Sequence, residues 1–365
     1  MPRLPPSLLR RAHRISPHLA ALLPVCRDLA SARNELRWIR EHVGDLLSRT
    51  RAPRKSEHGL LTRLCHRRGA GVPLQYVLGS QPFGNLDIQC RPGVLIPRPE
   101  TEAWVTHLAG VVRGDLGAGG RGGVGSTGLR VLDLCLGSGC IALLLHALLH
   151  RRFPGLSVRG YDVAPEAVAL ARRNLALNER RGLLRNPRGG VSFLEADIFA
   201  PDWLESLTRH DAPEMRPVVD ILVSNPPYIS ARGFHRDTAR SVRNHEPKRA
   251  LVPPSPPLWR PSALPSADDR PEDVFYVRLL EVADVLRPRL AVFEVGDLAQ
   301  GLRVAQMAIG RSGGASGAEV KVEIWRDWPD MRPQEDEADS MEINGIQVPV
   351  KGSGNGRAVF IRRVV

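Results

Sequence analysis

The sequence has few aromatic residues, no long apolar run and no clustered cysteines. Its 365 residues are 42% hydrophobic but only 5% aromatic, and the longest apolar run, Cys140 to Leu149, is interrupted by His146. A run of this length is too short to span a bilayer, so we expect no membrane association. The five cysteines include no CxxC pair and no Cys/His cluster with metal-site spacing, which predicts no metal and favours a reducing compartment.

Lysine is also scarce, since arginine supplies most of the 51 basic residues, and the formal net charge is +12. An arginine bias of this kind often follows genomic base composition. Two interpretations of the charge therefore stay open. The charge can attract RNA, ribosomes or another anionic partner, or it can be an ordinary solvated basic surface.

Acidic residues are absent from residues 1–27, which contain five arginines and an apolar side formed by leucine and isoleucine. An Arg-rich, acid-free, amphipathic N-terminus is typical of a mitochondrial transit peptide. Prolines such as Pro17 and Pro24 weaken the helix that this pattern predicts, and a disordered basic tail is the alternative. We expect residues 1–27 to be a mitochondrial targeting segment.

The next part of the chain changes from helical patterns to a hairpin and then to a glycine-rich stretch. Apolar residues at helical spacing predict helices over 28–48 and 57–68, and so a small helical domain over 28–81. Glycine and proline between short apolar pieces predict a hairpin and connector over 82–108. Residues 109–128 are rich in glycine, and we expect a flexible linker there.

Strands and helices alternate over 129–365, which predicts a parallel sheet covered by helices on both faces. The last two strands, KVEIW and AVFIRRV, are expected to pair as an antiparallel hairpin. A proline-rich segment, 252–272, and a polar segment, 333–356, are interpreted as insertions. The predicted strands before that hairpin cover 129–132, 158–161, 191–194, 218–223 and 290–295.

A glycine-containing loop, VLDLCLGSGC, links the first of these strands to a helix. Such a loop brings backbone N–H groups close to a ligand at the helix N-terminus. Asp162 ends the second strand, where a carboxylate can accept both hydroxyls of a ribose, and Asp197 follows the third. A tight turn is the alternative for the glycines alone. The ordered set predicts a nucleoside-type ligand, and the absence of a third glycine favours S-adenosylmethionine over a dinucleotide; the set is Asp133, Gly137, Gly139, Asp162 and Asp197.

The fourth predicted strand runs into the sequence SNPPYIS. Two adjacent prolines, Pro226 and Pro227, remove two backbone donors and hold the chain in extended geometry. Asn225 offers a side-chain carbonyl oxygen and Pro226 a backbone carbonyl, which suit the two hydrogens of a planar NH2 group, and Tyr228 can stack on it. We predict that these four residues aim a nucleophilic nitrogen at a donor methyl group. A proline-rich turn after a buried strand is the alternative.

The ordered motifs VLIPRPETE, VLDLCLGSGCIAL, VSNPPYIS, VRNHEPKRAL and FEVGDLAQ resemble the HemK-type release-factor glutamine methyltransferases. The resemblance implies an α/β class I S-adenosylmethionine (SAM)-dependent methyltransferase fold. Its Rossmann-like sheet would have seven mostly parallel strands with an antiparallel last strand, after a helical substrate-recognition domain and a β-hairpin. By the same resemblance, the cofactor would contact Asp133, Cys135, Leu136, Gly137, Ser138, Gly139, Asp162, Asp197, Ile198 and Asn225.

The resemblance also implies the substrate, which is the glutamine side-chain amide in the Gly-Gly-Gln motif of a class I peptide-chain release factor. With the targeting segment, the partner would be a mitochondrial release factor in the matrix; without it, the protein would be cytoplasmic. We expect a monomer with no stable nucleic-acid partner. The sequence departs from the family at Cys135, where members usually carry glycine, and after EPKRAL, where a proline-rich segment replaces a glycine-rich one.

Two other substrates use the same chemistry and stay open. One is a ribosomal-protein glutamine, and the other is an adenine in nucleic acid, because adenine methyltransferases also carry NPPY. A base-modifying enzyme needs a base-flipping pocket and a target-recognition region, and the sequence shows only a short helical domain. A non-catalytic RNA-binding protein is a further alternative, against which Gly137, Asp162 and Asn225 argue.

Overall fold

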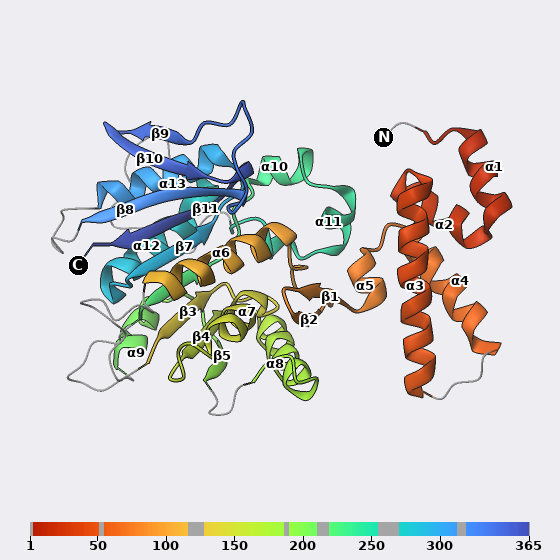
Figure 1. Cartoon of the computed structure of the whole chain (residues 1–365), viewed down its shortest axis with the longest axis horizontal. Helices are drawn as coiled ribbons and strands as arrows, with labels where there is room; N and C mark the ends of the chain where they lie inside the picture. Colours follow the sequence, from red (N-terminus) through yellow and green to blue (C-terminus); the bar gives the residue numbers. More distant parts are fainter. Residues whose placement is uncertain are drawn as a thin grey trace. The chain divides into compact units, whose positions relative to one another are not determined.

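The computed structural model describes residues 3–50, 55–115, 128–185, 190–209, 219–254, 270–311 and 319–364. The chain divides into two compact units (Figure 1). Within these residues, no helix combines the length and the hydropathy needed to cross a membrane. The first unit comprises Met1–Gln81, Cys90–Pro92 and Thr238–Glu246, and the second comprises Pro82–Gln89, Gly93–Asp237 and Pro247–Val365.

The first unit is helical, as the sequence predicted. Helices α3 and α4 confirm the predictions over 28–48 and 57–68. Buried leucine, isoleucine and valine side chains from α2, α3 and α4 form its core. The helices in chain order are α1 (Pro6–Ile15), α2 (Pro17–Cys26), α3 (Leu29–Thr50), α4 (Lys55–Gly69) and α5 (Leu74–Leu78), and the short α11 (Arg240–His245) belongs to the same unit.

The helical unit begins earlier than the boundary predicted at residue 28. Pro6 and Pro17 each open a helix, at the first position where a missing N–H breaks no helical hydrogen bond. The apolar side of α1 and α2 is therefore part of a core rather than of a separate segment. The buried apolar residues are Ala12, Leu19, Leu22 and Leu23, none more than 1% exposed. The targeting role of residues 1–27 stays a prediction.

The second unit contains a nine-stranded sheet in the order β5-β4-β3-β6-β7-β11-β8-β10-β9. The adjacent strands β5, β4, β3, β6 and β7 run parallel to one another. Strand β11 is antiparallel to both of its neighbours, β7 and β8. The order β5 to β8 confirms the predicted α/β methyltransferase-type sheet with an antiparallel last strand. The strands are β3 (Arg130–Leu134), β4 (Ser157–Asp162), β5 (Val191–Glu195), β6 (Ile221–Ser224), β7 (Leu290–Glu294), β8 (Val320–Trp328), β9 (Ser340–Ile343), β10 (Ile346–Lys351) and β11 (Ser353–Arg363).

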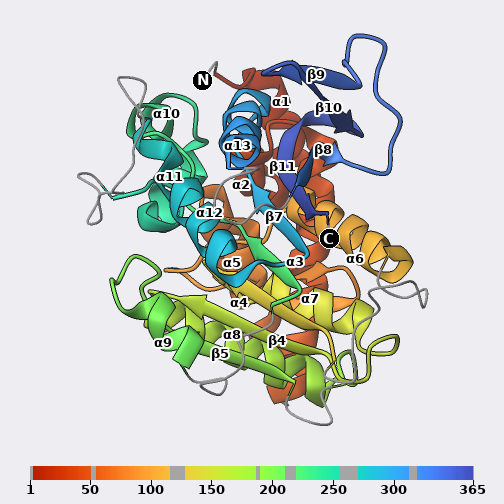
Figure 2. The same ribbon diagram turned by 90° about the vertical axis from the view of Figure 1, so that its left-hand side faces the viewer.

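Helices cover both faces of this sheet (Figure 2). One face packs against α6 (Pro99–Asp115), α7 (Cys140–Leu149) and α8 (Pro165–Arg180), and the other packs against α9 (Trp203–Arg209), α12 (Val274–Leu286) and α13 (Leu298–Gly310). Every residue of β6 and β7 is consequently buried, which explains why both strands are apolar at every position before their last residue rather than alternating.

Two predictions for residues 82–128 change in the structure. The hairpin is present as the two-stranded sheet β1 (Ser80–Phe83) and β2 (Leu86–Gln89), but the connector contains α6, a helix the sequence analysis missed. This helix continues to Asp115 because Leu108, Ala109 and Val112 face the core while Gly110 meets open space. The predicted linker therefore does not begin at residue 109, and its remainder, 116–127, lies outside the described residues.

The insertion at 333–356 enlarges the sheet from the expected seven strands to nine. Strands β9 and β10 form a hairpin, and β10 also pairs in parallel with β8. The alternation of β10 buries Val348 and Val350 against the sheet core. Most of the other predicted insertion, 255–269 within 252–272, lies outside the described residues.

Candidate active site

The site residues meet because three strands end in register. Leu134 of β3 pairs with Tyr161 of β4 on one side and with Ser224 of β6 on the other. The chain positions that follow these strands therefore leave the sheet at one edge. Ser224 strengthens this alignment, since its buried Oγ donates to the Leu134 carbonyl at 2.7 Å.

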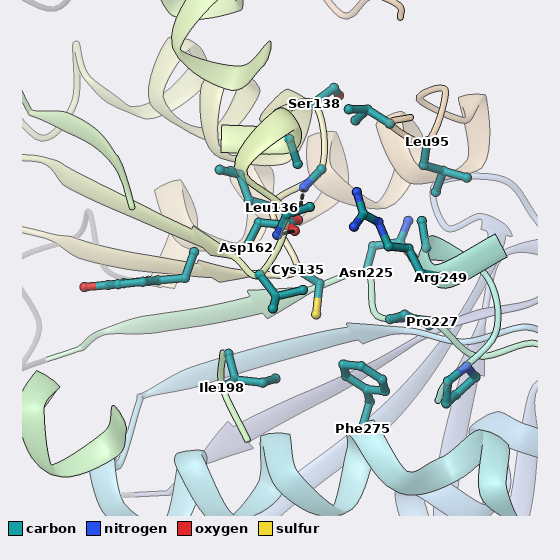
Figure 3. A pocket seen from close by; sticks show the side chains of 18 of the residues that line it. Leu95, Cys135, Leu136, Ser138, Asp162, Ile198, Asn225, Pro227, Arg249 and Phe275 are labelled. Atoms are coloured by element: carbon teal, nitrogen blue, oxygen red, sulfur yellow. Dashed lines mark hydrogen bonds between the residues drawn. The ribbon is translucent and has the colours of Figure 1, made fainter. Parts of the chain in front are cut away.

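A cavity of about 550 Å³ opens at this edge, within the second unit. Figure 3 shows Asp162 and Leu136 on one side of it, Asn225 and Pro227 across from them, and Ile198 and Phe275 along a third side. The predicted site residues in its wall are Cys135, Leu136, Gly137, Ser138, Asp162, Asp197, Ile198, Asn225 and Pro227. Asp133, Gly139, Pro226 and Tyr228 are not in the wall and lie behind or beside it.

The glycine loop has an unusual backbone that starts at Cys135. Cys135, Gly137 and Gly139 have φ values of +62°, +56° and +81°, in the left-handed region that favours glycine. A Cβ on Gly139 would also come within 2.9 Å of the Ala171 side chain, so this glycine packs the loop against α8. Burial raises the pKa of the Cys135 thiol, which keeps the thiol protonated and unreactive.

Asp162 ties the end of β4 to the loop. Its Oδ2 accepts a hydrogen bond from the Gly137 N–H at 2.8 Å, and its Oδ1 accepts one from the Ala164 N–H at 2.9 Å. A carboxylate offers about four acceptor positions, so both oxygens can still accept ligand hydroxyls. Burial raises the pKa of Asp162, while these two bonds and the charge of Arg249 act in the opposite direction.

Asp133 has a different place from the one predicted for a cofactor contact. It is fully buried, and its Oδ2 accepts a hydrogen bond from the Ala142 N–H in the first turn of α7 at 3.2 Å. Within the described part of the chain, its Oδ1 has no hydrogen-bond partner. Burial raises the pKa of Asp133 well above its ordinary value. The side chain thus supports the helix behind the glycine loop.

The residues that follow β5 contribute to the apolar wall of the cavity. Asp197 closes its own turn, since its Oδ1 accepts from the Phe199 N–H at 2.9 Å. The buried Arg278 of α12 donates from Nε to the Ile198 carbonyl at 2.7 Å and so fixes this wall. Phe275, from the same helix, lines the cavity beside it.

The NPPY segment follows β6, and its side chains point in two directions. Asn225 and Pro227 face the cavity, whereas the Tyr228 hydroxyl points to Glu294 at the end of β7, at 3.3 Å from Oε1. The Tyr228 carbonyl accepts from Gln300 Nε2 at 3.3 Å. The predicted amide-binding residues are therefore held by residues from β7 and α13.

Several lining residues were quoted in motifs but given no role by the sequence analysis. Arg98 and Thr101 come from IPRPETE, and Lys248 and Arg249 come from EPKRAL. Arg249 forms an ion pair with Glu166 at the start of α8. The motif EPKRAL lies far from the glycine loop in sequence, so nothing local in it indicated that Arg249 lies near Asp162. Among the described residues, no group of three or more potential ligands could hold a metal ion.

Similar proteins identify the family. Over 253 residues, the chain is 37% identical to the mitochondrial MRF1 N(5)-glutamine methyltransferase MTQ1 of Saccharomyces cerevisiae, across 69% of this chain and 68% of that protein. The chain belongs to the release factor glutamine methyltransferase family. This glutamine methyltransferase is also 36% identical over 254 residues to the probable MRF1 mitochondrial N(5)-glutamine methyltransferase mtq1 of Schizosaccharomyces pombe, across 68% of this chain and 73% of that protein.

No protein-family model matches this glutamine methyltransferase. Among solved structures, the N-terminal domain of human METTL16 in complex with SAH is 17% identical and covers 80% of this chain and 81% of that chain, with a TM-score of 0.41. Family membership confirms the resemblance predicted from the ordered motifs and the assignment to an enzyme class. The roles of the individual site residues stay predictions.

Proposed function

We propose that this chain transfers a methyl group from S-adenosylmethionine to the side-chain amide nitrogen of glutamine in the Gly-Gly-Gln motif of a mitochondrial class I release factor. One observation carries the proposal. Asn225, at the end of β6, opens into the same cavity as Asp162 and the glycine loop. An amide-binding group and a nucleoside-binding group therefore share one space in a member of this family.

The residues of the cavity fit the cofactor. Its volume of about 550 Å³ lies within the range of small-molecule sites, and its wall is mostly apolar. Both oxygens of Asp162 keep acceptor positions for ribose hydroxyls. The backbone of the loop from Cys135 to Ser138 can approach the cofactor closely, and Ile198 and Phe275 supply an apolar side for its base. When bound, S-adenosylmethionine supplies an electrophilic methyl group and leaves as S-adenosylhomocysteine.

The chain's own residues prepare the nucleophile. An amide nitrogen is a poor nucleophile because its lone pair is delocalised. The Asn225 side-chain oxygen and the Pro226 carbonyl would accept hydrogen bonds from its two hydrogens, hold the nitrogen in place and stabilise the positive charge that develops as the N–C bond forms and the methyl–sulfur bond breaks. The nitrogen then releases one proton to solvent. Pro227 restricts the backbone that carries these acceptors, so little reorganisation is needed.

The partner and the location follow the same family relationship. The two yeast relatives are named as mitochondrial enzymes for MRF1, and the family name specifies release factors. We infer a protein substrate, a location in the mitochondrial matrix and a monomeric enzyme without a stable nucleic-acid partner. The names of these relatives favour this substrate over the ribosomal-protein and adenine alternatives.

Incubation with methyl-labelled S-adenosylmethionine tests the proposal. We expect label on a mitochondrial release factor but not on a Gly-Gly-Ala variant of it, on ribosomal protein or on DNA. Asp162→Ala should weaken cofactor binding at least tenfold and remove labelling at low cofactor concentration. Label on ribosomal protein or DNA, with none on the release factor, would overturn the substrate assignment.

A further inference from the structure

Strand β7 ends in a buried carboxylate that the proposed reaction does not use. Glu294 is 1% exposed. Its Oε2 accepts hydrogen bonds from Thr101 Oγ1 at 2.6 Å and from Trp104 Nε1 at 2.8 Å. Its Oε1 accepts from the Tyr228 hydroxyl at 3.3 Å. A carboxylate can accept from all three donors, whereas the amide of a glutamine could accept from Thr101 and Trp104 but would present an NH2 donor to the Tyr228 hydroxyl and so reverse that bond.

Tyr228 is held from two further directions. Gln300 donates to its carbonyl oxygen at 3.3 Å, and the same side chain accepts from the Gly296 N–H at 2.8 Å. The ring itself lies against Gly296, where a Cβ atom would come within 3.1 Å of Tyr228 Cδ2. Tyr228, Glu294 and Gly296 are all outside the wall of the cavity, but Tyr228 directly follows Pro227, which is in it, so Glu294 and Gly296 can bear on the reaction only through this tyrosine.

We propose that Glu294 is a positioning residue for methyl transfer, acting through Tyr228. Together with Gly296 and Gln300 it forms a clamp on this tyrosine, which we call the β7 clamp. The inference rests on the proposed function, since it assumes that Tyr228 stacks on the target amide beside Asn225. It adds a role for a residue whose motif, FEVGDLAQ, suggested none.

The physical reason lies in the geometry of the tyrosine. The ring can rotate about two side-chain bonds, and Pro227 restricts only the backbone before it. The buried Glu294 carboxyl group accepts from the tyrosine hydroxyl and so fixes the direction in which that hydroxyl points. Gly296 leaves space for the ring in one orientation. The clamp therefore presents a preformed flat surface to the incoming amide, which lowers the ordering needed at the transition state.

Glu294→Gln tests the clamp with the least change in shape. In single-turnover methylation of the release factor, we expect turnover to fall about tenfold or more, with cofactor affinity within about twofold of the wild type. Tyr228→Phe, which removes the hydroxyl but keeps the ring, should show a similar loss. The double variant should be no slower than the slower single variant, because both changes break one interaction.

A matched control separates positioning from general support of the fold. The Tyr276 hydroxyl donates to the main-chain oxygen of the same Glu294 at 2.7 Å, and Tyr276 is fully buried outside the cavity wall. Tyr276→Phe should lower the melting temperature but leave turnover unchanged. Should Glu294→Gln fail to fold, Gly296→Ala keeps the carboxylate and displaces the ring, and it should also slow turnover.

Two results would overturn the clamp. One is wild-type turnover in a folded Glu294→Gln protein; the other is a double variant in which the two losses multiply. A crystal structure of Glu294→Gln adds a readout that needs no substrate, since an unmoved Tyr228 ring would equally reject the clamp. Failure of the proposed function is recognised separately, because the wild-type enzyme itself would then leave the release factor unlabelled.

Discussion

Asp162 ends β4 and Asn225 follows β6, the two strands on either side of β3, and both residues face the cavity. Asp162 is engaged with the glycine loop through Gly137, whereas Asn225 belongs to the segment expected to hold the amide. The two residues therefore allow binding of the cofactor and transfer of the methyl group to be tested apart.

Asn225→Ala should leave cofactor binding intact and slow methyl transfer by roughly a hundredfold, by analogy with removal of one preorganised hydrogen-bonding group. Asn225→Asp should be nearly as slow, because a carboxylate changes the local charge. A cofactor-binding isotherm beside single-turnover methylation measures both effects. Near-normal turnover in Asn225→Ala would contradict its role in holding the amide.

Cys135 adopts a backbone conformation, at φ +62°, that glycine tolerates best. In Cys135→Gly, relief of about 1 kcal/mol of strain is offset by the larger conformational entropy that glycine gives the unfolded chain, so the free energy of unfolding should change by less than about 1 kcal/mol. Cofactor affinity should be preserved or slightly improved. Cys135→Val, with a branched side chain at the same φ, should lower both the free energy of unfolding and the cofactor affinity. Calorimetric titration measures the affinities, and weaker cofactor binding by Cys135→Gly would refute the strain argument.

Asp133 should make stability depend on pH. Since burial raises its pKa in the folded protein, its contribution is present below the unfolded pKa of about 3.9 and is lost as pH rises toward the folded value. Asp133→Asn keeps an acceptor for the Ala142 N–H without a titrating group. The variant should therefore gain stability relative to wild type as pH rises above about 4. Urea unfolding across this range measures the difference, and a constant difference would refute it.

At the scale of elements, the hairpin β9–β10 shows how a polar insertion extends a sheet. Its turn is Asn344-Gly345, with φ values of +52° and +78°, the pair of left-handed residues that a two-residue hairpin loop requires. Asn-Gly between short strands is a strong hairpin signal, so the sequence held this information even though the insertion was predicted only as polar.

Two glycines of this region form a matched pair. A Cβ at Gly345 meets no atom within 4 Å, whereas a Cβ at Gly352 would lie 2.4 Å from the Trp328 carbonyl oxygen, and both residues have positive φ. Gly345→Ala should lower the free energy of unfolding by about 1 kcal/mol through strain alone, and Gly352→Ala by clearly more. Cofactor affinity should stay unchanged in both. Equal destabilisation in urea unfolding would show that the close approach of Trp328 is unimportant.

At the scale of the whole molecule, the N-terminal segment has an exposed basic face and a buried apolar face. The exposed side of α1 carries Arg10, Arg11 and Arg14, and the buried sides of α1 and α2 supply core residues such as Leu22. The amphipathic pattern that suggested targeting also explains the packing, because the same apolar side can face a core.

Exchange of Arg10, Arg11 and Arg14 for glutamine should reduce mitochondrial import without changing the melting temperature. Leu22→Ala should lower the free energy of unfolding of the helical unit by about 2–5 kcal/mol, with cofactor affinity unchanged because the cavity lies in the second unit. Import assays and thermal unfolding measure these effects. Full import of the glutamine variant would refute the targeting role of the arginines.

The sequence by itself determined the alternation of strands and helices, the strand ends that carry the glycine loop, Asp162 and NPPY, and the family. These features are local, because periodicity, proline and glycine act within a few residues, and the motifs keep their order along the chain. The antiparallel last strand was likewise predictable from two apolar runs near the end.

Only the tertiary structure decided which motif residues face the cavity. Asp133 and Asp162 are both acidic residues near strand ends, yet one is buried behind the loop and the other faces the cavity. In the register of β3 and β4, Asp133 lies opposite Gly160, two positions before Asp162, so Asp133 sits within the sheet while Asp162 stands at its edge. Glu294 meets Thr101, Trp104 and Tyr228 across sequence separations of 193, 190 and 66 residues, contacts that no local pattern can encode.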